Sequence, residues 1–165
     1  MSKITLQLFG ELRVTVDSQV VDNFRTNKIL ALLVYLVTER KQSHQRDGLM
    51  TLLWPGLPQK SAQVNLRQTL YLLRKSFLDV TAHSVDEPVP FLISDRRKIG
   101  VNPQALIEDD LSAFESLLDS TQQHKHENLL TCHLCRTRLE KATLLYRGPF
   151  LADFYLPDSS EFEIW

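Results

Sequence analysis

The sequence lacks the short motifs with which many enzymes bind phosphates, metals or acyl groups. It contains no Gly-rich phosphate loop, no H-E-x-x-H pair and no G-x-S-x-G nucleophile turn. Glu108, Asp109 and Asp110 stand where we expect a helix to begin, and carboxylates there stabilise the helix dipole without any catalytic role. We therefore expect no enzymatic activity.

Long apolar runs and cysteines are also scarce. The first ten residues, MSKITLQLFG, lack the apolar stretch of a secretory signal, and the apolar run at 29–37 (ILALLVYLV) is too short to cross a bilayer. We expect a cytoplasmic protein with no membrane partner. In that compartment the two cysteines, Cys132 and Cys135, are expected to be reduced or metal-bound rather than joined in a disulfide.

Charge is unevenly distributed along the 165 residues, although the formal net charge is only −1. Residues 1–104 contain 14 Lys and Arg against 9 Asp and Glu, a net of +5, whereas residues 105–165 contain 5 against 11, a net of −6. The hydrophobic content of 43% is ordinary for a soluble globular protein. A basic half followed by an acidic half predicts two modules with different partners, of which the first can meet nucleic acid.

The stretch QKSAQVNLRQTLYLLRKSFL at 59–78 predicts a helix, because it contains no Gly or Pro, and the spacing of its apolar residues makes this helix amphipathic. One helical stripe is apolar and is expected to be buried: Ala62, Leu66, Leu70, Leu73 and Phe77. The opposite face and its flank are mostly basic or polar and contain no acid: Lys60, Ser61, Val64, Arg67, Gln68, Tyr71, Arg74 and Lys75. Such a face suits a DNA major groove, since Arg and Lys bind phosphates or guanine edges and Gln binds adenine. The residues from Lys60 to Tyr71 are the candidate base readers, Arg74 and Lys75 are phosphate contacts or plain surface, and the alternative for the whole face is a solvated helix.

The elements before this helix predict a helix-turn-helix unit behind a small sheet. Three alternating segments, 3–9, 12–16 and 19–21, are typical of an antiparallel meander, and a strongly apolar core helix is predicted over 28–39. A shorter helix over 44–53 ends at Trp54-Pro55-Gly56. At the start of the core helix, Thr26, Asn27 and Lys28 either bind a phosphate through free backbone N–H groups or simply cap the helix.

A β-hairpin with a cationic tip is predicted after the basic helix. Its strands are 91–94 and 98–101, and its tip is Asp95-Arg96-Arg97 followed by Lys98. In this position the hairpin indicates a winged helix, whose wing contacts backbone phosphates or the minor groove through Arg96, Arg97 and Lys98. The alternative is that the tip is only solvated.

The acidic half predicts further helices over 107–120, 129–146 and 158–165. The chain ends on Trp165 just as the last helix begins, so we expect the sequence to be a piece of a longer protein.

Four zinc-type ligands occur within 12 residues of this half. His124, His126, Cys132 and Cys135 have the spacing H-x-H-x5-C-x2-C, and zinc favours four N and S ligands. A structural zinc is one interpretation. The alternative is that the cysteines are small core residues of a helix and the histidines are solvated in a loop.

Several stretches resemble one family of proteins. KILALLVYL from Lys28, HQRD at 44–47 with LLWP at 52–55, and NLRQTLYLLRKSF at 65–77 are similar to the OmpR-type winged-helix domain of SARP-type transcriptional regulators. ATLLYRGPFLADFYLPDSSEFEIW at 142–165 is similar to the start of the bacterial transcriptional activation domain, which is an all-α, TPR-like array in this family. The resemblance covers nearly the whole chain, and LYRGPFLADF is its most specific part.

The resemblance implies an α+β winged helix over 1–104, with N-terminal antiparallel strands, three helices and a C-terminal hairpin wing, followed over 105–165 by a truncated TPR-like fragment. It implies a sequence-specific transcriptional activator in the bacterial cytoplasm, at the nucleoid, with helix 59–78 in the major groove and the wing at 90–102. The implied partners are double-stranded DNA, RNA polymerase, C-terminal TPR or sensor domains of the same chain, and a second copy on direct-repeat sites. The alternative function is a protein-interaction module that uses the TPR-like helices and a basic surface without reading DNA.

Overall fold

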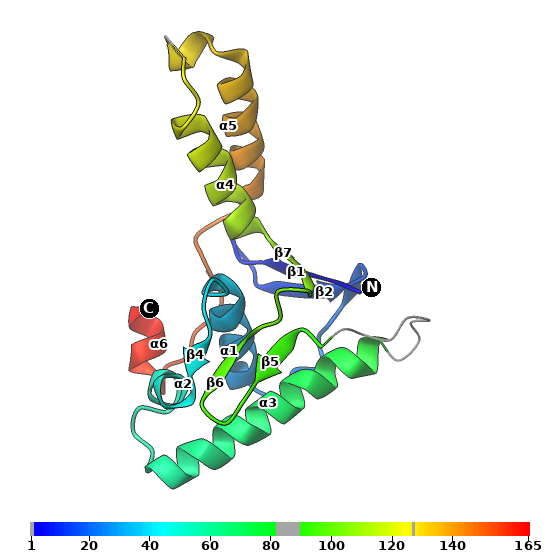
Figure 1. Ribbon diagram of the computed structural model, residues 1–165, viewed down its shortest axis with the longest axis vertical. Coiled ribbons are helices and arrows are strands. Elements are labelled where there is room, and N and C mark those ends of the chain that lie inside the picture. Colours follow the sequence, from blue (N-terminus) through cyan, green and yellow to red (C-terminus); the bar gives the residue numbers. More distant parts are fainter. Residues whose placement is uncertain (1, 82–89, 127) are drawn as a thin grey trace. The chain divides into compact units, whose positions relative to one another are not determined.

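The computed structural model describes residues 2–81, 90–126 and 128–165 and shows a mixed α/β fold (Figure 1). Within these residues no helix combines the length and the apolar character that a membrane-spanning segment needs. The elements in chain order are β1 (Lys3–Gln7), β2 (Arg13–Val16), β3 (Gln19–Val20), α1 (Asn27–Thr38), β4 (His44–Gln45), α2 (Arg46–Leu53), α3 (Gln59–Thr81), β5 (Leu92–Ser94), β6 (Lys98–Val101), β7 (Leu106–Asp109), α4 (Asp110–Gln122), the 3₁₀ turn η1 (Leu129–Thr131), α5 (His133–Leu145) and α6 (Ser160–Ile164).

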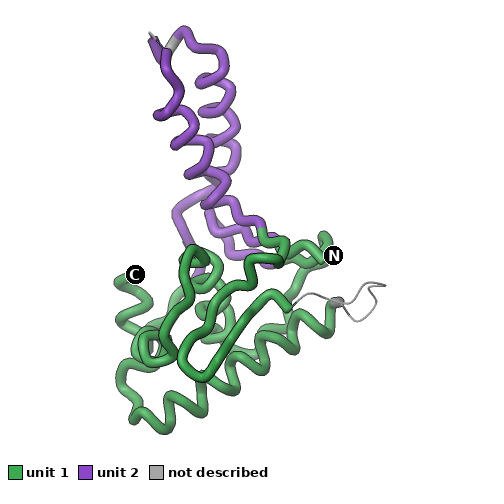
Figure 2. Tube along the Cα trace, viewed as in Figure 1, with its two compact units in different colours: residues 1–4, 15–107, 155–165 green, residues 5–14, 108–154 purple. Residues whose placement is uncertain are grey.

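The chain divides into two compact units, shown in different colours in Figure 2. The first unit consists of residues Met1–Ile4, Thr15–Ile107 and Tyr155–Trp165, and the second of Thr5–Val14 and Glu108–Phe154. Each unit therefore combines segments that are far apart in the sequence.

A four-stranded sheet has the order β3-β2-β1-β7. The turn between β2 and β3 has two residues, Asp17 and Ser18, both with positive φ (49° and 70°), as a type I′ hairpin requires. The Lys3 N–H donates to the Asp17 carboxylate at 2.8 Å, and this bond holds the pKa of Asp17 below its usual value. The predicted meander is confirmed, whereas β7 (Leu106–Asp109) corrects the predicted helix over 107–120, which begins only at Asp110.

A second sheet has the order β4-β6-β5. Its strand β4 corrects the sequence-based prediction of a helix over 44–53, because His44 and Gln45 pair with Ile99 and Lys98 of β6 and the helix begins only at Arg46. The segment just before β4 approaches strand β6 closely. A Cβ added to Gly100 in β6 would lie 2.7 Å from the Ser43 Oγ, so the residue facing β4 has to be glycine or the contact must shift.

The core of the first unit is built around α1, which buries seven of its twelve residues. Helices α2 and α3 pack against it. The stripe predicted for α3 is confirmed, because each of its members is at most 5% exposed: Ala62, Leu66, Leu70, Leu73 and Phe77. Burial of these side chains fixes which face of α3 remains outside.

The C-terminal segment of the first unit is tied to α1 and α2 by polar contacts. The Lys28 ammonium forms an ion pair with Asp158 at 3.0 Å and donates to the Leu53 carbonyl and the Ser159 hydroxyl. The Trp165 indole N–H donates to the Glu39 carboxylate at 3.0 Å. These contacts hold α6 beside α2.

The second unit is centred on the carboxylate of Asp110, whose side chain is 6% exposed. Its oxygens accept from the backbone N–H groups of Leu8 (2.7 Å) and Phe9 (3.2 Å) and from the Arg147 guanidinium (2.6 Å). The neighbouring Asp109 caps α4 by accepting from the Ser112 N–H at 2.6 Å. Asp110 thus joins the end of β1, the start of α4 and the segment after α5.

Residues 148–151, inside the stretch LYRGPFLADF, run beside residues 8–10 in the second unit. The Gly10 N–H donates to the Pro149 carbonyl at 2.9 Å, and the Leu151 N–H donates to the Leu8 carbonyl at 2.8 Å. Gly10 has a φ of 79°, and a Cβ on Gly148 would lie 3.2 Å from the Gly10 Cα. Two glycines therefore permit this close backbone contact.

We expect Asp110→Ala to lower the free energy of unfolding by about 2–4 kcal/mol, because two buried backbone N–H groups lose their acceptor. The ion pair adds less, since Arg147 is 42% exposed. Urea denaturation of the variant and of the wild type measures the difference. Asp119→Ala, which removes an exposed carboxylate of the same helix, is the control. Equal unfolding midpoints for Asp110→Ala and the wild type would contradict the role given to Asp110.

Candidate nucleic-acid interface

Helix α3 presents one continuous polar face to solvent. All eight side chains predicted for this face are exposed: Lys60, Ser61, Val64, Arg67, Gln68, Tyr71, Arg74 and Lys75. Two of them are large apolar or aromatic groups, with Val64 58% and Tyr71 63% exposed. Since the helix already buries its opposite stripe, the exposure of these two groups has no explanation in packing.

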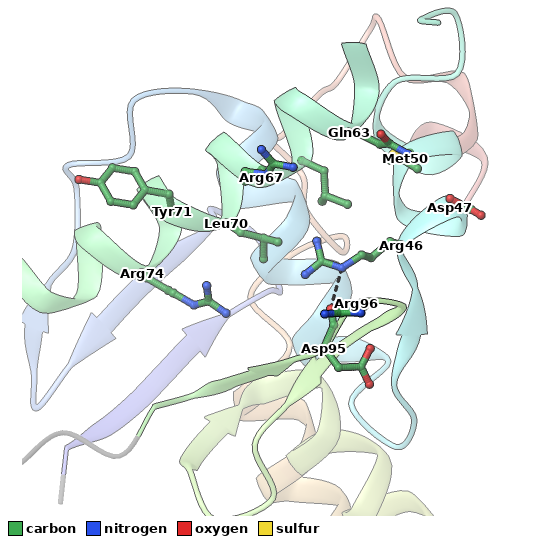
Figure 3. A pocket seen from close by; sticks show the side chains of 11 residues that line it. Arg46, Asp47, Met50, Gln63, Arg67, Leu70, Tyr71, Arg74, Asp95 and Arg96 are labelled. Carbon is green, nitrogen blue, oxygen red and sulfur yellow. Dashed lines mark hydrogen bonds between the residues drawn. The ribbon is translucent and has the colours of Figure 1, made fainter. Parts of the chain in front are cut away.

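An open groove of about 670 Å³ lies between α3, the start of α2 and the tip of the β5–β6 hairpin (Figure 3). Its floor is apolar and comes from Met50, Leu66 and Leu70. Its walls carry more cations than anions: Arg46, Asp47, Gln63, Arg67, Tyr71, Arg74, Asp95 and Arg96. Four guanidinium groups against two carboxylates give the groove a positive character, which attracts anionic ligands.

The hairpin tip is shaped by the carboxylate of Asp95. This group accepts from the backbone N–H groups of Arg97 (2.6 Å) and Lys98 (2.7 Å), and the Asp95 N–H in turn donates to the Lys98 carbonyl at 3.0 Å. The Lys98 N–H, followed by the Arg97 N–H, holds the pKa of Asp95 below its usual value. The tip therefore keeps a defined turn at neutral pH and leaves Arg96, Arg97 and Lys98 exposed.

Two arginines connect the hairpin to the helices. The Arg46 side chain donates from Nε to the Asp95 carbonyl at 3.0 Å, drawn as the dashed line in Figure 3, and the Arg46 backbone N–H donates to the Arg97 carbonyl at 2.8 Å. The Arg74 guanidinium donates to the Ser94 hydroxyl at 2.8 Å. The sequence analysis did not select Arg46. Its position depends on the pairing of β4 with β6, for which a two-residue strand gives no periodic signal.

The three predicted residues at the start of α1 do not line this groove. Thr26 and Asn27 are exposed at the N-terminus of the helix. Lys28 is instead half-buried, with Asp158, Ser159 and the Leu53 carbonyl around its ammonium and the Trp54 ring 5.8 Å away. Because these groups already hold the ammonium, Lys28 serves the packing of the C-terminal segment.

Within the second unit, the structure brings together the four predicted metal ligands. One ligand atom from each of His124, His126, Cys132 and Cys135 lies within 4.8 Å of the others. The backbone N–H of Cys135 lowers the pKa of the Cys132 thiol, whereas burial raises the pKa of the Cys135 thiol. Sequence spacing found these residues, and the fold places them in one cluster.

No protein-family model and no curated protein matches this chain. Among solved structures, the chain is similar to Mycobacterium tuberculosis EmbR in complex with a low-affinity phosphopeptide, with a TM-score of 0.72 and 23% sequence identity. The match covers 99% of this chain and 41% of the EmbR chain, so this chain spans less than half of that protein. The two proteins share a fold.

We expect the hairpin tip to respond to acid. Because the pKa of Asp95 is lowered in the folded state, the stabilisation of the turn by its ionised carboxylate is present at neutral pH. It is lost as the pH falls below the ordinary aspartate value of about 3.9 and through the lower folded value. The amide NMR signals of Arg97 and Lys98 should shift over this range. In Asp95→Asn, which keeps an oxygen acceptor but cannot ionise, the same signals should stay in place. If the amide signals of Arg97 and Lys98 in the wild type do not shift as the pH falls, this account of the turn is wrong.

Proposed function

We propose that this protein is a sequence-specific DNA-binding transcriptional regulator whose DNA contacts lie within residues 1–104. The observation that carries the proposal is the exposed face of α3, which has no acid from Gln59 to Leu78, beside an arginine-bearing hairpin that Arg46 and Arg74 connect to the helices. The resemblance to SARP-type regulators and the fold shared with EmbR support it.

In this proposal α3 is the recognition helix of a winged helix and lies in the major groove. From Gln59 to Leu78 it carries cations, amides and hydroxyls and no carboxylate, so no side chain of this stretch repels phosphate. Arg67 and Gln68 can form bidentate contacts with guanine and adenine, and the exposed Val64 can contact a thymine methyl group. The helix has 23 residues and is about 34 Å long, so its N-terminal and middle turns approach the bases while Arg74 and Lys75 meet the backbone.

The β5–β6 hairpin, residues 90–102, is the proposed wing. Arg96, Arg97 and Lys98 would contact backbone phosphates or the adjacent minor groove, and Thr26 and Asn27 are candidates for a further phosphate contact. Arg46 and Arg74 hold the wing at a fixed place on the helices. This arrangement would orient the protein on the duplex before the bases are read.

The remaining parts of the proposal rest on the family resemblance. Residues 105–165 would begin a TPR-like activation domain, and the protein would act as an activator with RNA polymerase as a partner. Further TPR or sensor domains would follow in the longer chain, and two copies would bind direct-repeat sites.

We expect Arg67→Ala or Gln68→Ala to weaken binding to a selected operator by about 10- to 100-fold, the cost of one bidentate base contact. Binding to random duplex should change much less. A binding-site selection with random duplexes supplies the operator, and fluorescence anisotropy measures both affinities. Lys141→Ala, which removes an exposed cation of α5, is the matched control and should bind like the wild type. If both helix variants keep wild-type affinity for the operator, the assigned reading face is wrong.

We expect the double substitution Arg96→Ala with Arg97→Ala to weaken binding to operator and random duplex by similar factors, because these side chains are assigned to phosphates. The slope of log K against log salt should become shallower by about 2, one unit for each lost contact. Titrations over a range of KCl concentrations measure the slope. A loss confined to the operator would assign the two arginines to base reading instead.

If the selection enriches no sequence and the wild type binds duplex without any salt dependence, the protein-interaction module becomes the better interpretation. In that case the exposed face of α3 would dock an acidic protein.

A further inference from the structure

The cluster of His124, His126, Cys132 and Cys135 has no part in the proposed DNA interface. His124 and His126 follow the end of α4, Cys132 is the N-cap of α5 and Cys135 lies in its first turn. His124 and Cys132 are half-buried, Cys135 is fully buried, and both cysteines are free thiols. The four side chains come from a loop and a helix and point to one place.

Three nitrogen–sulfur distances within the cluster are close to those of a tetrahedral metal site. Nδ1 of His124 lies 3.2 Å from the Cys135 Sγ and 3.5 Å from the Cys132 Sγ, and Nδ1 of His126 lies 3.7 Å from the Cys135 Sγ. Around a zinc ion with Zn–S of about 2.3 Å and Zn–N of about 2.0–2.1 Å, an N and an S ligand are about 3.6 Å apart. The three measured distances are within 0.4 Å of this spacing.

Simple packing does not account for this convergence. If the cysteines were only small core residues, the imidazoles would be free to turn toward water, as in an ordinary polar loop. Instead one nitrogen of each ring faces a thiol sulfur, and the two rings lie 5.7 Å apart at 30°. The thiol of Cys135 also has a weak acceptor in the Thr121 carbonyl at 3.9 Å.

The two helices next to the site, α4 and α5, have a small apolar core that a bound metal would reinforce. In α4 the buried residues are Asp110 and Thr121, and in α5 they are Cys135 and Ala142, so this helical pair buries few large apolar side chains. A hydrogen bond from the Arg138 guanidinium to the Ser120 carbonyl at 2.6 Å is one polar connection between the two helices. Small units with thin cores are commonly held by a metal or another crosslink.

We propose that His124, His126, Cys132 and Cys135 bind one structural Zn²⁺ that fastens the loop after α4 to the start of α5. Two sulfur and two nitrogen ligands are a donor set that zinc favours, and four protein ligands leave no open position for a substrate. The inference is independent of DNA binding, because it uses only residues of the second unit.

Metal analysis of the full chain, purified without a His-tag, tests the site. We expect about one zinc per wild-type chain and less than about a tenth in Cys132→Ser with Cys135→Ser. His133→Ala removes an exposed histidine of α5 that is not in the cluster, and it should keep the full zinc content. Wild-type protein that holds less than about a tenth of an equivalent after dialysis against ZnCl₂ and removal of free metal would overturn the proposal.

Alkylation of the wild type keeps the test decisive if the double variant does not fold. Bound zinc should slow the reaction of both thiols with N-ethylmaleimide by at least about tenfold, and a chelator such as 1,10-phenanthroline should restore the fast rate. Mass spectrometry of the Cys132–Cys135 peptide measures the extent of reaction. Equal rates with and without the chelator would overturn the assignment.

Discussion

The burial of α1 is the constraint on which the rest of the first unit depends. This helix is apolar around most of its circumference, so neighbouring elements must cover it on several sides. Helix α3 packs against it and buries its own apolar stripe, and α2, through Leu49 and Leu53, adds to the same core. Because the stripe is buried in the core, α3 has a single orientation about its own axis. The residues left outside include the basic and amide side chains, so a packing requirement determines the face that we propose binds DNA.

Amphipathic periodicity was the most dependable signal in the sequence. It predicted the buried stripe of α3 and the alternating strands at the N-terminus, because both patterns extend over enough residues to repeat. Strand β4 has only two residues and no pattern to recognise, so the sequence favoured an earlier helix start. The place of Arg46 was missed for the same reason. Its contact with Asp95 spans 49 positions and exists only when β4 pairs with β6.

The second unit shows the same division between local and distant information. Adjacent acids predicted a helix from residue 107, but Leu106–Asp109 forms β7 and the helix begins at Asp110, where Asp109 caps it. Nothing near Asp110 in the sequence indicates that its carboxylate will meet backbone groups more than a hundred residues earlier. The histidines and cysteines could be selected as a group because they lie within 12 residues of one another. Whether their ligand atoms converge depends on how α5 begins after η1, which spacing alone does not determine.

The return of residues 155–165 to the first unit has a consequence for synthesis. Leu156, Ser159 and Phe162 are buried there, and the ammonium of Lys28 meets partners that are made about 130 residues after it. A ribosome releases the chain from its N-terminus, so α1, α2 and α3 emerge long before the segment that completes their packing. Residues 108–154 of the second unit must be translated in between. Of the two units, the one that carries α3 is therefore completed second, and a stalled chain that lacks residues 155–165 leaves part of its core uncovered.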